Sequence, residues 1–219
     1  MAQMGIHMAV GLIGARTERV RTSISGLGFL IGNIFPDIDF LLLIPFRFIN
    51  RDFALQLHRS ATHSIILVLL ILILGFIFHI FDKQKIKMFL YGASAGILVH
   101  IFLDFFMWFN QVDFLWPLDI HLDLYKNMNI PDFIPNIVAS FETACYAILL
   151  LYIQKLVSQD NKQIVQISIV LFFLTLIQLP FALITPAKQF EVISYGVAII
   201  VGFSYSSFTL LRYRKELLI

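Results

Sequence analysis

Histidine and aspartate residues gather in three short clusters, each inside or beside a very apolar segment. The clusters are Pro36-Asp37-Ile38-Asp39, His58-Arg59-Ser60-Ala61-Thr62-His63 and His100-Ile101-Phe102-Leu103-Asp104. Ionisable groups at membrane depth are costly unless they are paired or bound to an ion, so such residues indicate a functional site. Imidazole and carboxylate are also ligands of zinc and related transition metals. The pattern therefore predicts a metal site in a membrane protein.

The composition is that of an integral membrane protein. Of the 219 residues, 59% are hydrophobic and 14% are charged, whereas a soluble domain has roughly 25% charged residues. Mean hydropathy is +0.85. The net charge of +2 is too small to indicate a nucleic-acid partner. We predict a single integral membrane domain over residues 1–219, with the motifs in residues 1–120 and the C-terminal spans in residues 121–219.

Hydropathy predicts an all-α fold, a multi-pass transmembrane helical bundle with about five full spans. The predicted spans are Ser64–Phe81, Lys87–Trp108, Ile134–Leu156, Ile164–Ile184 and Val192–Leu211. Near the N-terminus, Met4–Ala15 and Ile24–Phe35 have about a dozen residues each, too few to cross a membrane alone as helices. The apolar stretch Phe40–Phe46 follows a predicted break at Pro36. We interpret these segments as broken or half-inserted helices.

Basic residues predict the orientation in the membrane. The lysines within residues 83–87 mark one connection as cytoplasmic, whereas the acidic stretch 109–133 belongs outside. This orientation brings the three polar clusters to a similar depth in the extracytoplasmic leaflet. Arg47, Arg51 and Arg59 disagree with it, because the scheme leaves them outside.

The spacing of His100 and Asp104 is the most informative within the clusters. The two residues are i and i+4 on a predicted helix, so they share one face and can reach the same ion. The alternative is a His–Asp hydrogen bond between packed helices.

Asp37 and Asp39 follow a proline, which favours an extended backbone. In an extended segment, residues i and i+2 point the same way, so the two carboxylates are predicted to converge. Two such groups repel each other unless a cation lies between them. A solvated turn is the alternative.

His58 and His63 are five residues apart, which places them about 140° apart around a regular helix. They can meet at one site if His58 lies on the incoming loop and His63 on the first helical turn, with Ser64 or Thr62 as the N-cap. His7 is a single histidine in a short apolar segment, a setting more typical of a core residue than of a ligand.

The order of these motifs resembles the YdjM-like family of membrane-bound, metal-dependent hydrolases. The residues that carry the resemblance are His7, Asn33-Ile34-Phe35-Pro36-Asp37-Ile38-Asp39, His58-Arg59-Ser60-Ala61-Thr62-His63-Ser64, His100-Ile101-Phe102-Leu103-Asp104 and Leu115-Trp116-Pro117-Leu118. They fall within about the first 120 residues. The resemblance implies a metal site with His7 among its ligands, and a location in a bacterial cytoplasmic (inner) membrane.

The candidate ligands are more numerous than one ion needs when a water must also bind. They are His7, Asp37, Asp39, His58, His63, His100 and Asp104. Two divalent ions bridged by Asp37 or Asp39 fit this number, and mixed His and Asp ligands suit zinc, manganese or iron better than calcium. We predict two ions, with zinc favoured. Paired ions about 3.5–4 Å apart activate water and bind the oxygens of a phosphoester.

Arg59 and Glu142 are the candidate catalytic residues. Arg59 can offer its planar donor fork to a phosphate, and the alternative is a snorkelling topology charge. Glu142 is an isolated acid in an apolar span, for which a general base, a metal ligand and a buried hydrogen-bond partner are alternative roles.

A site near one leaflet, reached laterally from lipid, predicts a membrane lipid as substrate. The leading hypothesis is hydrolysis of a phosphoester in a phospholipid or lipid-linked phosphate by metal-activated water. One alternative is an intramembrane zinc amidase that resembles alkaline ceramidases, although the paired histidines of that family on a late span are absent here. Another is a non-enzymatic metal-ion carrier or sensor, although inverted repeats typical of transporters are not visible. The sequence does not predict the oligomeric state.

Overall fold

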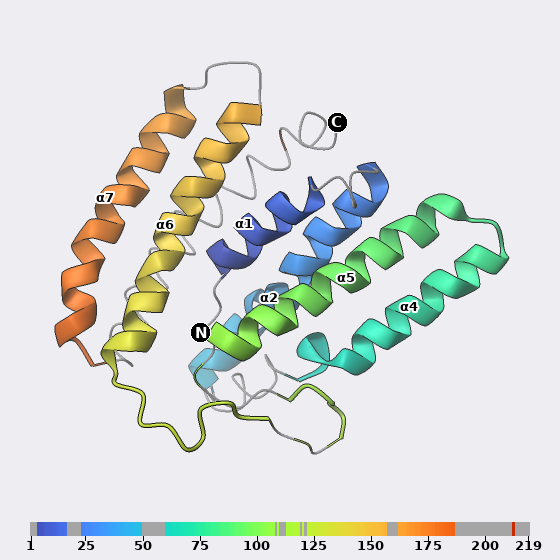
Figure 1. Ribbon diagram of the computed structural model, residues 1–219, viewed down its shortest axis with the longest axis horizontal. Coiled ribbons are helices and arrows are strands. Elements are labelled where there is room, and N and C mark those ends of the chain that lie inside the picture. The colour runs from blue at the N-terminus through green and yellow to red at the C-terminus, as the bar shows by residue number, and fades with distance from the viewer. Residues whose placement is uncertain are drawn as a thin grey trace. The chain divides into compact units, whose positions relative to one another are not determined.

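The computed structural model describes residues 4–16, 23–49, 60–107, 109, 113–118, 120, 122–156, 162–186 and 212. Within this part of the chain the fold is all-helical, as predicted, and contains no β-strand. The elements are α1 (Met4–Ala15), α2 (Ser23–Ile49), the 3-10 turn η1 (Ala61–His63), α4 (Ile65–Ile80), α5 (Gln84–Met107), α6 (Phe133–Leu156) and α7 (Lys162–Ile184), shown in Figure 1.

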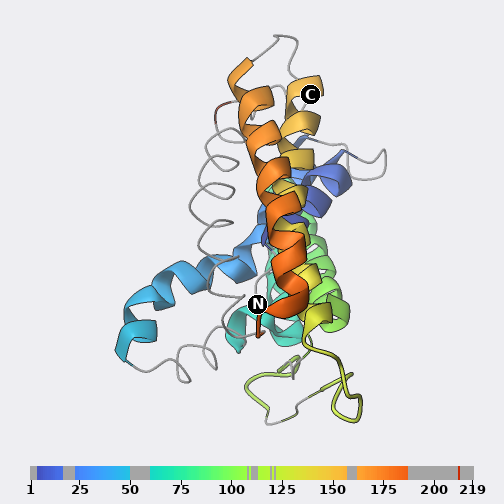
Figure 2. The same cartoon turned by 90° about the vertical axis from the view of Figure 1, so that its left-hand side faces the viewer.

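The chain divides into two compact units. The first unit comprises residues 1–9 and 129–219, and the second unit comprises residues 10–128. In the first unit, α6 and α7 lie side by side as an antiparallel hairpin (Figures 1 and 2). In the second unit, α5 packs against both α2 and α4. The interpretation of residues 1–219 as a single domain stays a prediction.

Three described helices are long and apolar enough to cross a membrane, namely Gln84–Met107, Phe133–Lys155 and Lys162–Ile184. Their bounds agree closely with three predicted spans, but their number is lower than the predicted five. The predicted span Ser64–Phe81 corresponds to α4, whose 16 residues measure only about 24 Å against a hydrocarbon core of about 30 Å. The predicted span Val192–Leu211 lies outside the described residues.

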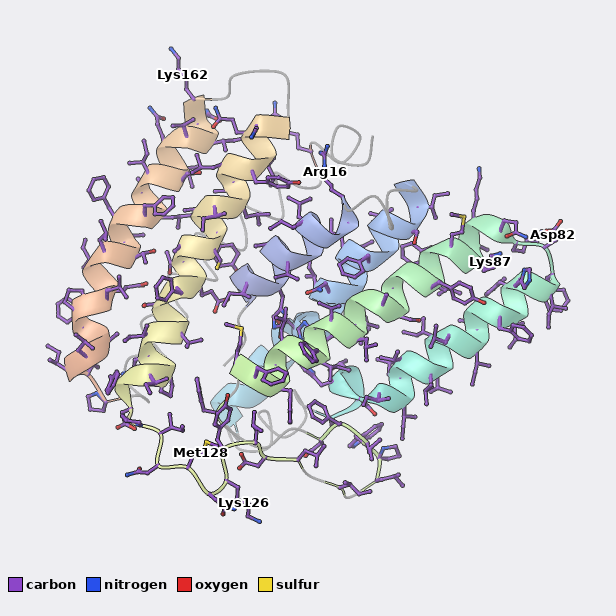
Figure 3. All side chains as sticks on the ribbon, in the orientation of Figure 1. Arg16, Asp82, Lys87, Lys126, Met128 and Lys162 are labelled. Atoms are coloured by element: carbon purple, nitrogen blue, oxygen red, sulfur yellow. The ribbon has the colours of Figure 1, made fainter. Side chains whose placement is uncertain are left out.

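Several charged side chains lie at the ends of these helices or in the connections. Figure 3 shows Asp82 and Lys87 at the turn between α4 and α5, and Lys162 at the start of α7. Lys126 lies in the connection that follows α5 (Figure 3). Long apolar helices flanked in this way are typical of membrane proteins.

The predicted break at Pro36 is wrong, because α2 continues through it from Ser23 to Ile49. A proline removes one hydrogen bond from a helix. In hydrocarbon, an extended segment leaves every N–H and C=O without a partner, at several kcal/mol each. Continuing the helix is therefore the less costly choice. The predicted convergence of the Asp37 and Asp39 carboxylates stays a prediction, because the Asp39 side chain lies outside the described part of the chain.

Glycines bring α2 and α5 into close contact. Gly28 and Gly32 on α2 lie against backbone atoms of Phe89 and Ala93, and a Cβ at either glycine would overlap a carbonyl oxygen there. Gly92 and Gly96 on α5 lie equally close to the α2 backbone. Each helix thus has two small residues four positions apart, the spacing that lets membrane helices approach closely. This contact fixes α2 relative to α5 and so the residues that both helices provide.

In the first unit, buried polar side chains join α6 to α7. The Thr143 hydroxyl donates to Gln178 Oε1 at 3.1 Å. The Asn136 amide donates to the carbonyl oxygens of Ala182 and Thr185 at 3.1 and 2.8 Å. Hydrogen bonds of this kind stabilise pairs of apolar helices, because lipid offers the same groups no partners.

Candidate metal centre

His63 is held by the turn that leads into α4. It is the last residue of η1, and Ser64 caps α4 by accepting a hydrogen bond from Ile66 N at 3.1 Å. The Ser64 hydroxyl also lies 2.8 Å from the Trp116 carbonyl oxygen, and Ile65 N donates to Phe114 O at 2.8 Å. The segment after α5 thus anchors the start of α4. Ser64 is one of the two N-caps that the sequence suggested.

We expect Ser64→Ala to lower the free energy of unfolding by about 2 kcal/mol, because it removes both the helix cap and the bond to the loop. Metal content should fall with it, since His63 is the preceding residue. Thermal unfolding of the purified protein in detergent, with metal analysis, measures both effects. Ser94→Ala is the matched control, because the Ser94 hydroxyl donates to Leu90 O within α5. Equal stability of the two variants would contradict the anchoring role.

His100 and Asp104 lie on α5, one turn apart, and both are buried. His100 Nδ1 lies 2.9 Å from the carbonyl oxygen of Asn33 on α2. A carbonyl oxygen can only accept, so Nδ1 carries the hydrogen and, in the neutral ring, Nε2 carries the free lone pair. Such a bond orients a histidine for metal binding, because it fixes both the tautomer and the ring plane.

Four side chains of the second unit converge on one buried point. His63 Nε2 and His100 Nε2 are 3.1 Å apart. Asp104 Oδ2 lies 3.3 Å from His63 Nε2 and 3.6 Å from His100 Nε2. Asp37 Oδ1 lies 3.9 and 3.7 Å from the same two nitrogens. These groups come from α2, η1 and α5, and we call them the buried centre.

The donor set of the buried centre fits a divalent metal ion. His63, His100 and Asp104 each offer one ligand atom, and these atoms lie within 4.8 Å of one another. Two imidazole nitrogens bound to zinc at about 2.0–2.1 Å and at a tetrahedral angle lie about 3.4 Å apart, close to the spacing of the two Nε2 atoms. Two buried carboxylates also repel each other without a cation. The residues can therefore hold an ion.

The other predicted ligands are less well defined. His7 lies on α1 in the first unit and is buried, and its role as a ligand stays a prediction. Asp39 belongs to α2, but its side chain lies outside the described part of the chain. His58 and Arg59 lie outside the described residues altogether. The presence of a second ion, which these residues would serve, stays a prediction too.

Glu142 has a structural partner within the first unit. Its Oε1 accepts a hydrogen bond from Gly5 N at 2.9 Å. Gly5 lies in the first turn of α1, where backbone N–H groups have no partner in their own helix and a negative charge is stabilising. Among the alternative roles of Glu142, that of a buried hydrogen-bond partner is supported directly by this bond from Gly5 N. Its predicted catalytic role stays a prediction.

Two residues of the second unit were missed as contributors to the buried centre. Thr62 Oγ1 lies 3.1 Å from His63 Nδ1, and Asn33 accepts from His100 through its carbonyl oxygen. Thr62 could have been recognised as a neighbour of His63, and Asn33 by its position four residues before Asp37 on a continuous helix. The predicted break at Pro36 separated Asn33 from Asp37, so their four-residue spacing on one helix was not recognised.

The fold and the buried centre define a helical membrane protein with histidine and aspartate side chains gathered in its interior. Residues 2–203 match the family model described as YdjM inner membrane protein. The chain therefore belongs to the YdjM family of inner membrane proteins, as its motifs predicted. The metal-dependent hydrolase activity that the resemblance implied stays a prediction. No curated protein and no solved structure matches the chain.

Proposed function

We propose that the protein is a metal-dependent hydrolase that cleaves a phosphoester of a phospholipid or lipid-linked phosphate. The observation that carries this proposal is the convergence of His63, His100, Asp104 and Asp37 at one buried point. A divalent ion bound there supplies Lewis-acid activation of water and neutralises charge that develops on phosphate oxygens. Zinc suits this mixed imidazole and carboxylate set, and manganese or iron are the alternatives.

The protein's own contribution is to position the ligands and exclude bulk water. The Asn33 carbonyl and Thr62 hydroxyl orient the two imidazoles. Burial of the whole group strengthens its electrostatic interactions, because the surroundings have a low dielectric constant. An imidazole or carboxylate that is not engaged by the ion can hold a proton for the leaving group.

An apolar pocket lined by sequence neighbours of the buried centre supports a lipid substrate. The pocket has a volume of about 390 Å³, within the usual range for small-molecule sites. Its walls include Ile65, Ile101 and Phe105, which follow His63, His100 and Asp104 by one or two residues. Two more of its lining residues, Leu98 and Phe102, are exposed, as lipid-facing side chains are. We assign this pocket to an acyl chain whose headgroup lies at the buried centre.

The test combines metal analysis with a phospholipid panel. The protein purified in detergent should contain bound zinc or a related ion, and should release a phosphorylated headgroup or phosphate from at least one phospholipid. Prolonged treatment with a chelator should remove both the metal and the activity, and the metal should restore the activity. Asp104→Asn keeps the side-chain shape but weakens ligation, so it should lower metal content, whereas Asp82→Asn in the exposed α4–α5 turn should not.

Three results would overturn the proposal in different ways. Metal-free protein that chelators do not affect would leave the buried centre as a His–Asp hydrogen-bond cluster. Cleavage of a lipid amide instead of a phosphoester would indicate an amidase. Metal flux across proteoliposomes, without turnover of any lipid, would indicate a carrier.

A further inference from the structure

Asn33 has an unusual environment for an amide side chain. It lies on α2 with 0% of its surface exposed, and neither its Nδ2 nor its Oδ1 has a hydrogen-bond partner among the described residues. A buried amide without a partner loses its hydration and gains nothing in return. Such a group in a folded protein calls for a physical explanation, and a bound ligand is one.

The position of Asn33 relates it to the buried centre. Asn33 precedes Asp37 by four residues on a continuous helix, so both side chains project from the same face of α2. Asp37 Oδ1 lies 3.7 Å from His100 Nε2, and the Asn33 carbonyl accepts from the other nitrogen of the same ring. The Asn33 amide is thus one helical turn from a carboxylate of the buried centre.

Gly11, in the part of α1 that belongs to the second unit, packs closely against Asn33. A Cβ at Gly11 of α1 would lie 3.1 Å from Asn33 Cβ and 3.6 Å from Asn33 Cγ. The glycine therefore covers Asn33 with backbone and places no polar side chain of its own against the amide.

We propose that the Asn33 amide donates a hydrogen bond to an anionic phosphate oxygen bound at the buried centre. An amide suits this role because it provides N–H donors without a charge. A carboxylate at the same place would repel the anion. The inference rests on the proposed function, since it assigns Asn33 to recognition of the phosphoester that the ion activates.

The experiment measures binding of inorganic phosphate to the zinc-loaded full-length protein in detergent, by calorimetry, together with zinc content and melting temperature. Asn33→Leu replaces the amide with an apolar group of similar size. We expect it to retain zinc and to melt at the same or a higher temperature, because a buried group without a partner is removed. Phosphate affinity should fall about ten- to a hundredfold, the effect of losing one hydrogen bond to a charged group.

Two further variants make the test decisive. Asn33→Asp keeps the shape of the side chain and replaces the donor with a negative charge. It should weaken phosphate binding at least as much as Asn33→Leu does. It therefore tests the same role if the leucine variant fails to fold. Ser94→Ala, a buried change on α5, is the control and should bind phosphate as the wild type does.

The outcomes separate this inference from the proposed function. A folded Asn33 variant that retains zinc and binds phosphate as tightly as the wild type would overturn the role of Asn33 and leave the proposed function intact. Loss of zinc from both variants would also overturn it, because the amide would then support the ion and not the anion. Zinc-loaded wild type that binds no phosphate would overturn the proposed function and the role of Asn33 together.

Discussion

On the proposed function, replacement of His100 by alanine is expected to remove the bound metal and to lower phospholipid turnover by at least about a thousandfold, because activation of water would depend on the ion. His100 Nε2 lies within 3.7 Å of His63, Asp104 and Asp37, the other three members of the buried centre. Its loss removes one neutral ligand and leaves one imidazole beside two buried carboxylates. Metal analysis and the phospholipid assay, applied to the same preparation, measure both effects.

His79→Ala is the matched control for this prediction. His79 is an exposed histidine near the end of α4, where its Nδ1 lies 3.5 Å from Lys87 Nζ. The control variant should retain full metal content and turnover. If His100→Ala also retained a stoichiometric ion and normal turnover, the buried centre would not be the site of metal binding or of the reaction.

The helical nature of the chain and the pairing of His100 with Asp104 could be predicted from sequence because both depend on local spacing. Apolar runs of 20 residues or more predicted α5, α6 and α7 to within a few residues. The four-residue spacing placed His100 and Asp104 on one face of a helix. Ser64 was predictable as one of two candidate caps, because its hydroxyl stands just before an apolar run.

The path of the backbone at Pro36 could not be predicted from local preferences alone. Proline disfavours the helical backbone of the residue before it, and in water a segment broken there can bond to solvent. In an apolar surrounding the same break costs several backbone hydrogen bonds. A break at Pro36 is the outcome expected in water, so neither the continuous α2 nor the common face of Asn33 and Asp37 followed from the local pattern.

Long-range partners were also beyond the reach of local patterns. Gly5 and Glu142 are 137 residues apart in sequence, and nothing near either one indicates the hydrogen bond between them. The carbonyl of Asn33 meets His100 across 67 residues. Such pairs depend on which helices pack together. The paired glycines of α2 and α5 were the available signal for one of these contacts, since their four-residue spacing is visible in the sequence.

Gly32→Ala is expected to be among the most damaging single-methyl changes in the second unit. The added Cβ would overlap the Ala93 carbonyl oxygen, which is backbone and cannot rotate away. The helices α2 and α5 must then separate. We expect a loss of about 3 kcal/mol in the free energy of unfolding, at the upper end for overpacked interiors. Metal should be lost as well, because Asn33 and Asp37 of α2 meet His100 of α5 across the same contact.

Gly75→Ala on α4 provides the control for this change. Both substitutions replace a glycine in a helix with alanine, and so gain the same intrinsic helix propensity. At Gly75 the new methyl group would meet the ring of Tyr91, which is partly exposed and can move aside. Thermal unfolding and zinc content of the two variants therefore isolate the effect of close backbone contact. If Gly32→Ala proved as stable as Gly75→Ala and kept its zinc, α2 would not be positioned by its glycines, and the placement of Asp37 beside His100 would need another cause.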